Sequence, residues 1–245
     1  MQSQAAWWIR QIHLKSCFND PIPLAKHILP MPMLHIYPDA AGSNPDKPKL
    51  GCGAFIDIPS PVLFYMMWPK SIRFNKNTGH GNIGLKLSFL EGIAALCGII
   101  AEPKLLFNKV VMIHSDNLGL VLAFRKGHSR CLLTYSVILS LKKLETAFGM
   151  KLIIVKTPRC GSPQAEVADW LSKGQLQKVW KFFPHRRSEM GAHSSSLMHW
   201  LRNPTPTRVL GSAIIKELSE KYTLADMEFE WEDEVNPMIH HNFVL

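Results

Sequence analysis

Short apolar runs and longer helix-spaced apolar stretches alternate along the chain, and turn-rich segments separate them. Three short runs in the first third predict β-strands at 33–37, 51–58 and 62–68. The segments between them, AAGSNPDKP and PSP, are typical of turns. These three strands are therefore expected to pair as an antiparallel meander.

The middle of the chain alternates helical and strand-like patterns. Apolar residues at helical spacing predict helices at 84–100, 118–126, 132–148 and from Pro163 to Gly174, and two apolar runs predict strands at 109–115 and 150–156. Strands that are separated by helices usually pair in parallel. The expected fold is α/β, with a mixed five-stranded sheet of three antiparallel strands and then two parallel ones, flanked by helices.

Composition shifts divide the chain into three parts. Residues 1–32 form an N-terminal connector, whose Pro-rich segment PIPLAKHILPMP excludes regular hydrogen-bonded structure. Residues 33–180 form the core domain. Residues 181–245 follow a basic aromatic stretch, LQKVWKFFPHRR, and form a C-terminal extension with a helix at 210–221 and an acidic tail containing EFEWEDE.

The composition is that of a globular protein, with 47% hydrophobic and 19% charged residues. No stretch of 18 apolar residues lacks a charge or a breaker, and the N-terminus has no apolar run of the signal-peptide kind. The five cysteines are scattered, with no C-x-x-C pair, which argues against disulfide partners and a structural zinc site. We therefore expect an intracellular protein, cytoplasmic or nuclear.

The net charge of +9 is unevenly distributed. Residues 1–216 hold 27 Lys and Arg against 11 Asp and Glu, a net +16, whereas residues 217–245 hold 1 against 8, a net −7. A basic body of this kind favours polyanions, of which nucleic acid is the commonest, although a basic protein need not bind one. Four residues after the fourth strand are the best candidates for phosphate contacts: Arg125, Lys126, His128 and Arg130.

Four carboxylates occupy special places in this pattern. Asp39 ends the first strand, Glu91 lies inside the most apolar helix, Asp116 ends the fourth strand and Asp169 lies in the last core helix. Each alone has an ordinary explanation, as a turn residue, a helix cap or an exposed helix position. If they converge, their mutual repulsion requires divalent cations, and two Mg²⁺ or Mn²⁺ ions would equip such a site for phosphodiester hydrolysis.

The segments IYPDAAGS, LSFLEGIAAL, IHSDNLGLVLAF and AEVADWLSKG resemble the four motif blocks of ribonuclease H domains from reverse-transcribing elements, and most closely those of tyrosine-recombinase retrotransposons. The resemblance covers about residues 33–175. It implies a ribonuclease H-like fold, metal ligation by Asp39, Glu91, Asp116 and Asp169, and cleavage of the RNA strand of RNA–DNA hybrids. Weaker similarity extends into both flanking segments. No polymerase is expected, because Tyr37-Pro38-Asp39-Ala40 lacks the second Asp of the polymerase motif Y-x-D-D.

The sequence departs from this family at two places. Ser162 and Ala165 stand where the family often has a His and an Asn, which leaves metal binding intact but puts turnover in doubt. The alternative interpretation is therefore a weak or inactive nucleic-acid-binding module. A transposase, integrase or exonuclease is a third possibility, against which the position of Glu91 argues. His114 is interpreted as a packed core residue, and the acidic tail as a competitor of nucleic acid for the basic surface.

Overall fold

The computed structural model describes residues 33–42, 50–69, 72, 87–158, 162–184 and 194–222. The predicted N-terminal connector and the acidic tail from residue 223 lie outside these described residues. A compact unit begins at Met33, where the core domain is predicted to start.

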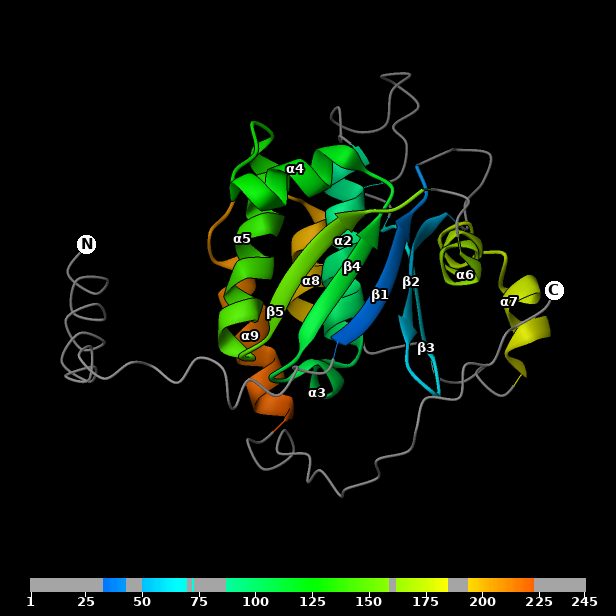
Figure 1. The fold of residues 1–245 in the computed structure, drawn as a ribbon. Coiled ribbons are helices and arrows are strands. Elements are labelled where there is room, and N and C mark those ends of the chain that lie inside the picture. The colour runs from blue at the N-terminus through cyan, green and yellow to red at the C-terminus, as the bar shows by residue number, and fades with distance from the viewer. Residues whose placement is uncertain are drawn as a thin grey trace, which may run out of the picture. The chain divides into compact units, whose positions relative to one another are not determined.

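Five strands form one sheet in the order β3-β2-β1-β4-β5 (Figure 1). They are β1 (Met33–Ala40), β2 (Gly51–Asp57), β3 (Val62–Met67), β4 (Val110–Ser115) and β5 (Lys151–Lys156). The pairs β1–β2 and β2–β3 are antiparallel, and β1–β4 and β4–β5 are parallel. The predicted α/β architecture with a mixed five-stranded sheet is confirmed. One strand differs in length, because β1 continues beyond residue 37 to Ala40.

Helices cover the two faces of the sheet unequally. The helices α2 (Leu87–Ala101), α4 (Leu118–Lys126) and α5 (Leu132–Ala147) pack on one face, and α6 (Pro163–Ser172) packs on the other (Figure 1). Alternation along β1 shows the division, since Ile36 meets α2 at Gly98 whereas Tyr37 packs with the cluster around α6. On this second face of the sheet, α6 contacts β1, β2 and β3. The part of the same face that β4 and β5 form is not covered by any described helix.

Gly53 of β2 allows α6 to lie directly on the sheet. A Cβ atom at this position would stand 2.3 Å from the Cβ of Leu171 and 2.9 Å from the backbone nitrogen of Ser172. No larger residue fits without moving the helix, because real Cβ atoms do not approach so closely. The glycine therefore sets the distance between α6 and the sheet.

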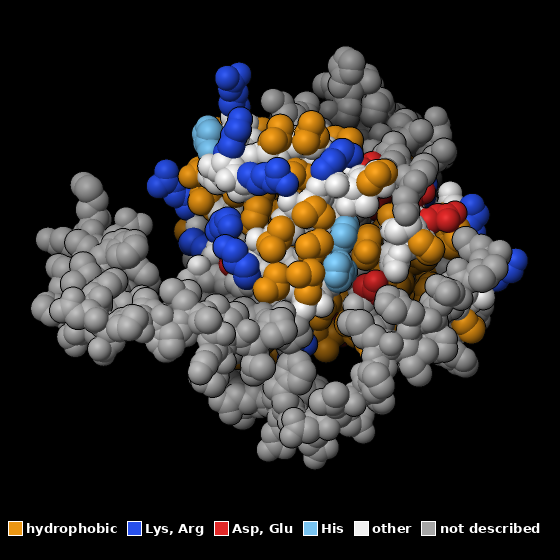
Figure 2. All heavy atoms as spheres, in the orientation of Figure 1, with side chains coloured by type: hydrophobic (Ala, Val, Ile, Leu, Met, Phe, Trp, Pro, Cys, Tyr) orange, Lys and Arg blue, Asp and Glu red, His pale blue; other side chains and the backbone are white. Residues whose placement is uncertain are grey.

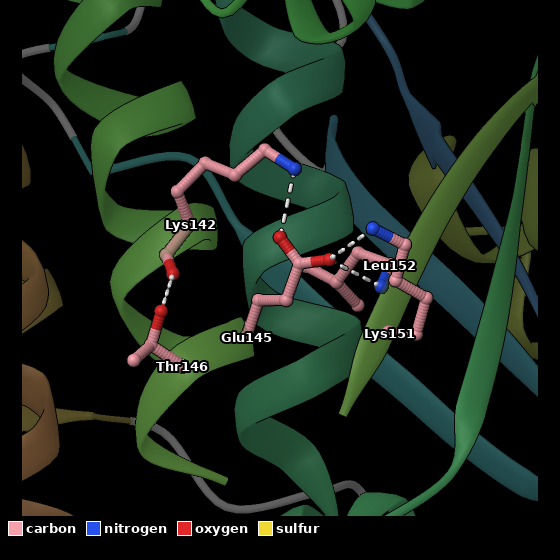
Figure 3. A network of polar contacts seen from close by, with 5 residues as sticks. All are labelled: Lys142, Glu145, Thr146, Lys151 and Leu152. Carbon is pink, nitrogen blue, oxygen red and sulfur yellow. Dashed lines mark hydrogen bonds and ion pairs between the residues drawn. The ribbon is translucent and has the colours of Figure 1, made fainter. Parts of the chain in front are cut away.

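A partly buried carboxylate joins the end of α5 to the start of β5 (Figure 3). Glu145, whose side chain is 13% exposed, accepts hydrogen bonds from the Leu152 backbone N–H (2.9 Å) and the Lys142 ammonium (2.7 Å). The Lys151 ammonium lies 3.7 Å from Oε1 of Glu145, the oxygen that the Leu152 N–H also contacts. These contacts hold the start of the edge strand β5 against the last turn of α5.

Four further helices complete the described chain: α3 (Pro103–Leu106), α7 (Leu176–Phe182), α8 (Ser195–Arg202) and α9 (Leu210–Lys221). The helix predicted at 210–221 is confirmed as α9, whereas α7 and α8 were not expected. Buried leucines of α8 and α9 join the main core cluster, and α9 packs along α5. The described part of the C-terminal extension therefore shares the core of the domain. No helix within the described ranges is long and apolar enough to cross a membrane.

Candidate active site

The pocket that brings the predicted acids together opens where two parallel strands separate. Pairing between β1 and β4 ends at Ile36 and Ile113, and the next residues of β1 include Pro38, which has no N–H to donate. In α/β sheets, crevices at the carboxyl ends of parallel strands are the usual ligand sites. The walls of this pocket comprise Tyr37, Pro38, Asp39, His114, Asp116, Thr157, Pro158, Ala165 and Asp169.

Asp39 lies in β1, opposite Gly53 of β2, on the face that α6 covers. Its carboxylate accepts a hydrogen bond from the hydroxyl of Ser172, a fully buried residue at the end of α6. Asp39 is the second-last residue of β1, and its side chain lines the pocket. The Ser172 hydroxyl from α6 orients its carboxylate.

Asp116 follows β4, and its two neighbours fix its backbone. The buried Ser115 hydroxyl accepts from the Asn117 N–H (3.1 Å), and the Asn117 side chain accepts from the Leu120 N–H (2.9 Å) and so caps α4. The helix cap is thus Asn117 and not Asp116, which is partly exposed and lines the pocket. The ammonium of Lys156 lies 2.6 Å from the Asp116 carbonyl oxygen.

Asp169 projects from α6 into the pocket, and its side chain is 27% exposed. The ammonium of Lys173, one turn further along the chain, lies 2.6 Å from its Oδ2 atom. At the other end of α6, the Ser162 hydroxyl accepts from the Ala165 N–H at 3.2 Å and caps the helix. Ala165 lines the pocket, so α6 presents a methyl group to the pocket at this position.

Glu91 differs from the other three acids, because it is 1% exposed and does not line the pocket. It lies in α2, beneath the sheet, close to the thiol of Cys52. Burial raises the pKa of that thiol, and a hydrogen bond with Cys97 and the charges of Glu91 and Asp39 raise it further. The Cys52 thiol, which stays protonated, therefore lies near both carboxylates.

The donor set suits hard divalent cations. Three carboxylates from β1, the end of β4 and α6 face one pocket, and Mg²⁺ and Mn²⁺ prefer such oxygen ligands. As the side chains stand, no three His, Cys, Asp or Glu residues in the described ranges are close enough to hold one ion. The ammonium of Lys173 contacts Oδ2 of Asp169, so an ion that binds this oxygen has to replace the lysine.

His114 belongs to this pocket, which corrects its interpretation as a packed core residue. It is partly exposed, and its ring stacks on Tyr37 with centroids 4.2 Å apart. One ring nitrogen lies 2.8 Å from His35 Nδ1 and the other 3.0 Å from the Thr157 hydroxyl. Burial and the neighbouring His35 lower the pKa of His114, while Asp57 opposes them. The sequence could have indicated this location, because side chains two residues apart along a strand point to the same face and His114 stands two residues before Asp116.

The predicted phosphate-binding residues Arg125, Lys126, His128 and Arg130 are all exposed. Arg125 and Lys126 form the last turn of α4, and Gly127 ends the helix in a left-handed conformation. The helix starts two residues after Asp116, and its nine residues span about 14 Å. Figure 2 shows basic side chains over this helix and histidines beside the strands. The basic residues thus lie beyond the acid pocket on the same side of the molecule.

Comparison with known families and curated proteins adds no relative: no family model matches the chain. No curated protein matches it either.

Proposed function

We propose that this chain is a metal-dependent ribonuclease H-like endonuclease that hydrolyses the RNA strand of RNA–DNA hybrids, derived from a retroelement polyprotein. The observation that carries the proposal is the meeting of Asp39, Asp116 and Asp169 in one pocket, from three elements far apart in the sequence. The order of strands and helices also agrees with the four motif blocks of that family.

Asp39, Asp116 and Asp169 are the residues that would hold two Mg²⁺ or Mn²⁺ ions. Glu91, the fourth ligand that the family resemblance implies, is buried in α2 and would contribute only if its side chain turned toward the pocket. When bound, such ions supply a nucleophilic water at neutral pH and stabilise the leaving oxygen. Asp39 in β1 and Asp116, directly after the neighbouring parallel strand β4, would face the reacting phosphate, and the Ser172 hydroxyl orients the Asp39 carboxylate. Without these carboxylates the pocket has no means of collecting cations.

Substrate binding would rely on charge and on helix shape. Arg125 and Lys126 form the last turn of α4, a helix about 14 Å long that begins two residues after Asp116. They would contact phosphates that flank the cleaved bond. Recognition of the hybrid by shape and by 2′-hydroxyl groups predicts little sequence preference.

The alternative, a weak or inactive nucleic-acid-binding module, is favoured by one observation. The side chain at position 165, on the pocket wall, is a methyl group, and Ser162 is engaged as a helix cap. Neither residue offers a group for proton transfer comparable to the histidine that the family often has. Binding without turnover is the result that this alternative predicts.

The experiment that tests the proposal is a cleavage assay on a labelled RNA–DNA hybrid, with duplex DNA and duplex RNA of the same sequence, in Mg²⁺ and in Mn²⁺. The variant Asp116→Asn removes a pocket carboxylate. The control Glu220→Gln makes the corresponding change in α9, at a carboxylate that is 68% exposed and does not line the pocket.

Hybrid-specific cleavage that Asp116→Asn abolishes and Glu220→Gln retains would support the nuclease. Hybrid binding without cleavage in either metal would favour the inactive module. Cleavage that survives in Asp116→Asn would overturn the assignment of the site.

A further inference from the structure

Two lysine ammonium groups lie at the acid pocket, and they contact different kinds of acceptor. Lys173 Nζ lies 2.6 Å from Asp169 Oδ2, a carboxylate oxygen. Lys156 Nζ lies 2.6 Å from the carbonyl oxygen of Asp116 and 3.2 Å from that of Thr157. The first contact pairs the lysine with a carboxylate, whereas the second pairs it with two uncharged carbonyl oxygens.

The contact of Lys173 involves an oxygen that a divalent ion would need. Asp169 is the one pocket acid on α6, and Lys173 follows it by four residues, the spacing at which helical side chains meet. The Asp169 side chain is 27% exposed and that of Lys173 46% exposed, so the pair is partly shielded from water without being buried. Such a pair can be exchanged at modest cost.

From this geometry we infer that Lys173 is a built-in counterion of Asp169 that competes with divalent cations and thereby sets the metal affinity of the pocket. This inference rests on the proposed metal-dependent function. It assigns Lys173 a positioning role, since its ammonium acts through Asp169. While no ion is bound, the lysine relieves the repulsion among the converging carboxylates; when an ion binds, the ammonium has to leave Asp169.

Lys156 supplies a matched control. Removing it also takes one positive charge from the surroundings of the pocket, but it breaks no contact with a carboxylate. The general electrostatic effect on a divalent ion is therefore common to both variants. The difference between Lys173→Met and Lys156→Met isolates the direct competition at Asp169.

The experiment measures Mn²⁺ binding to the full-length protein without nucleic acid, by the loss of the electron paramagnetic resonance signal of free Mn²⁺. Wild type, Lys173→Met, Lys173→Gln and Lys156→Met are titrated at low ionic strength, and circular dichroism melts confirm that each is folded. Because partly exposed ion pairs are weak, we expect both Lys173 variants to bind Mn²⁺ about two- to fivefold more tightly than wild type. Lys156→Met is expected to show a smaller gain.

Equal or weaker affinity in the Lys173 variants, beside measurable binding in wild type, would overturn the inference and leave the nuclease proposal standing. A gain in Lys156→Met as large as that in Lys173→Met would also overturn it, because the effect would then be general charge. If neither wild type nor any variant binds Mn²⁺ at millimolar concentration, the metal-dependent function itself fails, and the role of Lys173 with it.

Discussion

The hydroxyl of Ser172 donates a hydrogen bond to the carboxylate of Asp39, although 133 positions separate the two residues in the chain. Ser172 ends α6 and is fully buried, whereas Asp39 lies in the first strand of the sheet. The contact joins the helix that carries Asp169 to the strand that carries Asp39. The relative position of two pocket acids therefore depends on how α6 packs.

Replacing Ser172 with Ala should impair the site and weaken the fold moderately. A hydrogen bond to a charged group contributes about 1.5–3 kcal/mol to stability, and loss of a residue that orients a metal ligand typically costs about 10- to 100-fold in affinity or activity. Urea unfolding and Mn²⁺ titration measure the two effects. The control Ser140→Ala removes a buried hydroxyl that bonds only to the Ser136 carbonyl, at 2.9 Å. Equal effects of both changes on Mn²⁺ affinity would contradict the role of Ser172.

Gly53→Ala should push α6 away from the sheet. The added methyl group would meet the Leu171 side chain and the Ser172 backbone, and overpacking of this kind costs roughly 1–3 kcal/mol. We expect a lower free energy of unfolding together with weaker cleavage, because Asp169 moves with α6. Gly42→Ala is the control, since nothing lies within 4 Å of its Cβ position. A fully stable, fully active Gly53→Ala variant would show that α6 is free to shift.

Glu217 should give the protein an acid-sensitive contribution to stability. Burial alone would raise the pKa of this carboxyl, but hydrogen bonds from the Ser196 N–H, the Ser194 hydroxyl and the Ser195 N–H hold the pKa at about 2, below its ordinary 4.5. The stabilisation is complete above pH 4.5 and is lost as the pH falls through about 2. Because the group is partly solvated, we expect about 1–2 kcal/mol.

Urea unfolding of Glu217→Gln between pH 2 and pH 7 measures this contribution. The variant should be less stable than wild type at neutral pH, and the two should converge near pH 2. Glu220→Gln is the control, because its side chain is 68% exposed and lies 3.9 Å from Lys216. A difference between Glu217→Gln and wild type that does not change with pH would refute the assignment.

Deleting residues 225–245 should tighten nucleic-acid binding at low salt. This segment holds six of the eight acids that follow residue 216, and the rest of the chain is strongly basic. If the tail competes for the basic surface, its removal lowers the dissociation constant for the hybrid, and the gain shrinks as added salt screens the charges. Fluorescence anisotropy at two salt concentrations checks this. Unchanged affinity at low salt would contradict competition between the tail and nucleic acid.

The sequence by itself determined most of the secondary structure and three features of the site. Strand and helix periods locate all five strands and the main helices within a few residues, because each element buries one face and therefore alternates regularly. The same periods place Asp39 and Asp116 at the ends of two strands and Asp169 on the last core helix. These positions depend on local pattern and chain order alone.

Only the tertiary structure decided which side chains share the pocket. Periodicity says that His114 and Asp116 lie on one face of β4, but α6 covers only β1 to β3, so that face stays open and His114 remains partly exposed. The depth of Glu91 beneath Cys52 depends on how α2 packs under β1 and β2. The contact between Ser172 and Asp39 likewise depends on the close approach that Gly53 permits. Such contacts join residues distant in the chain, and local sequence pattern carries no information about them.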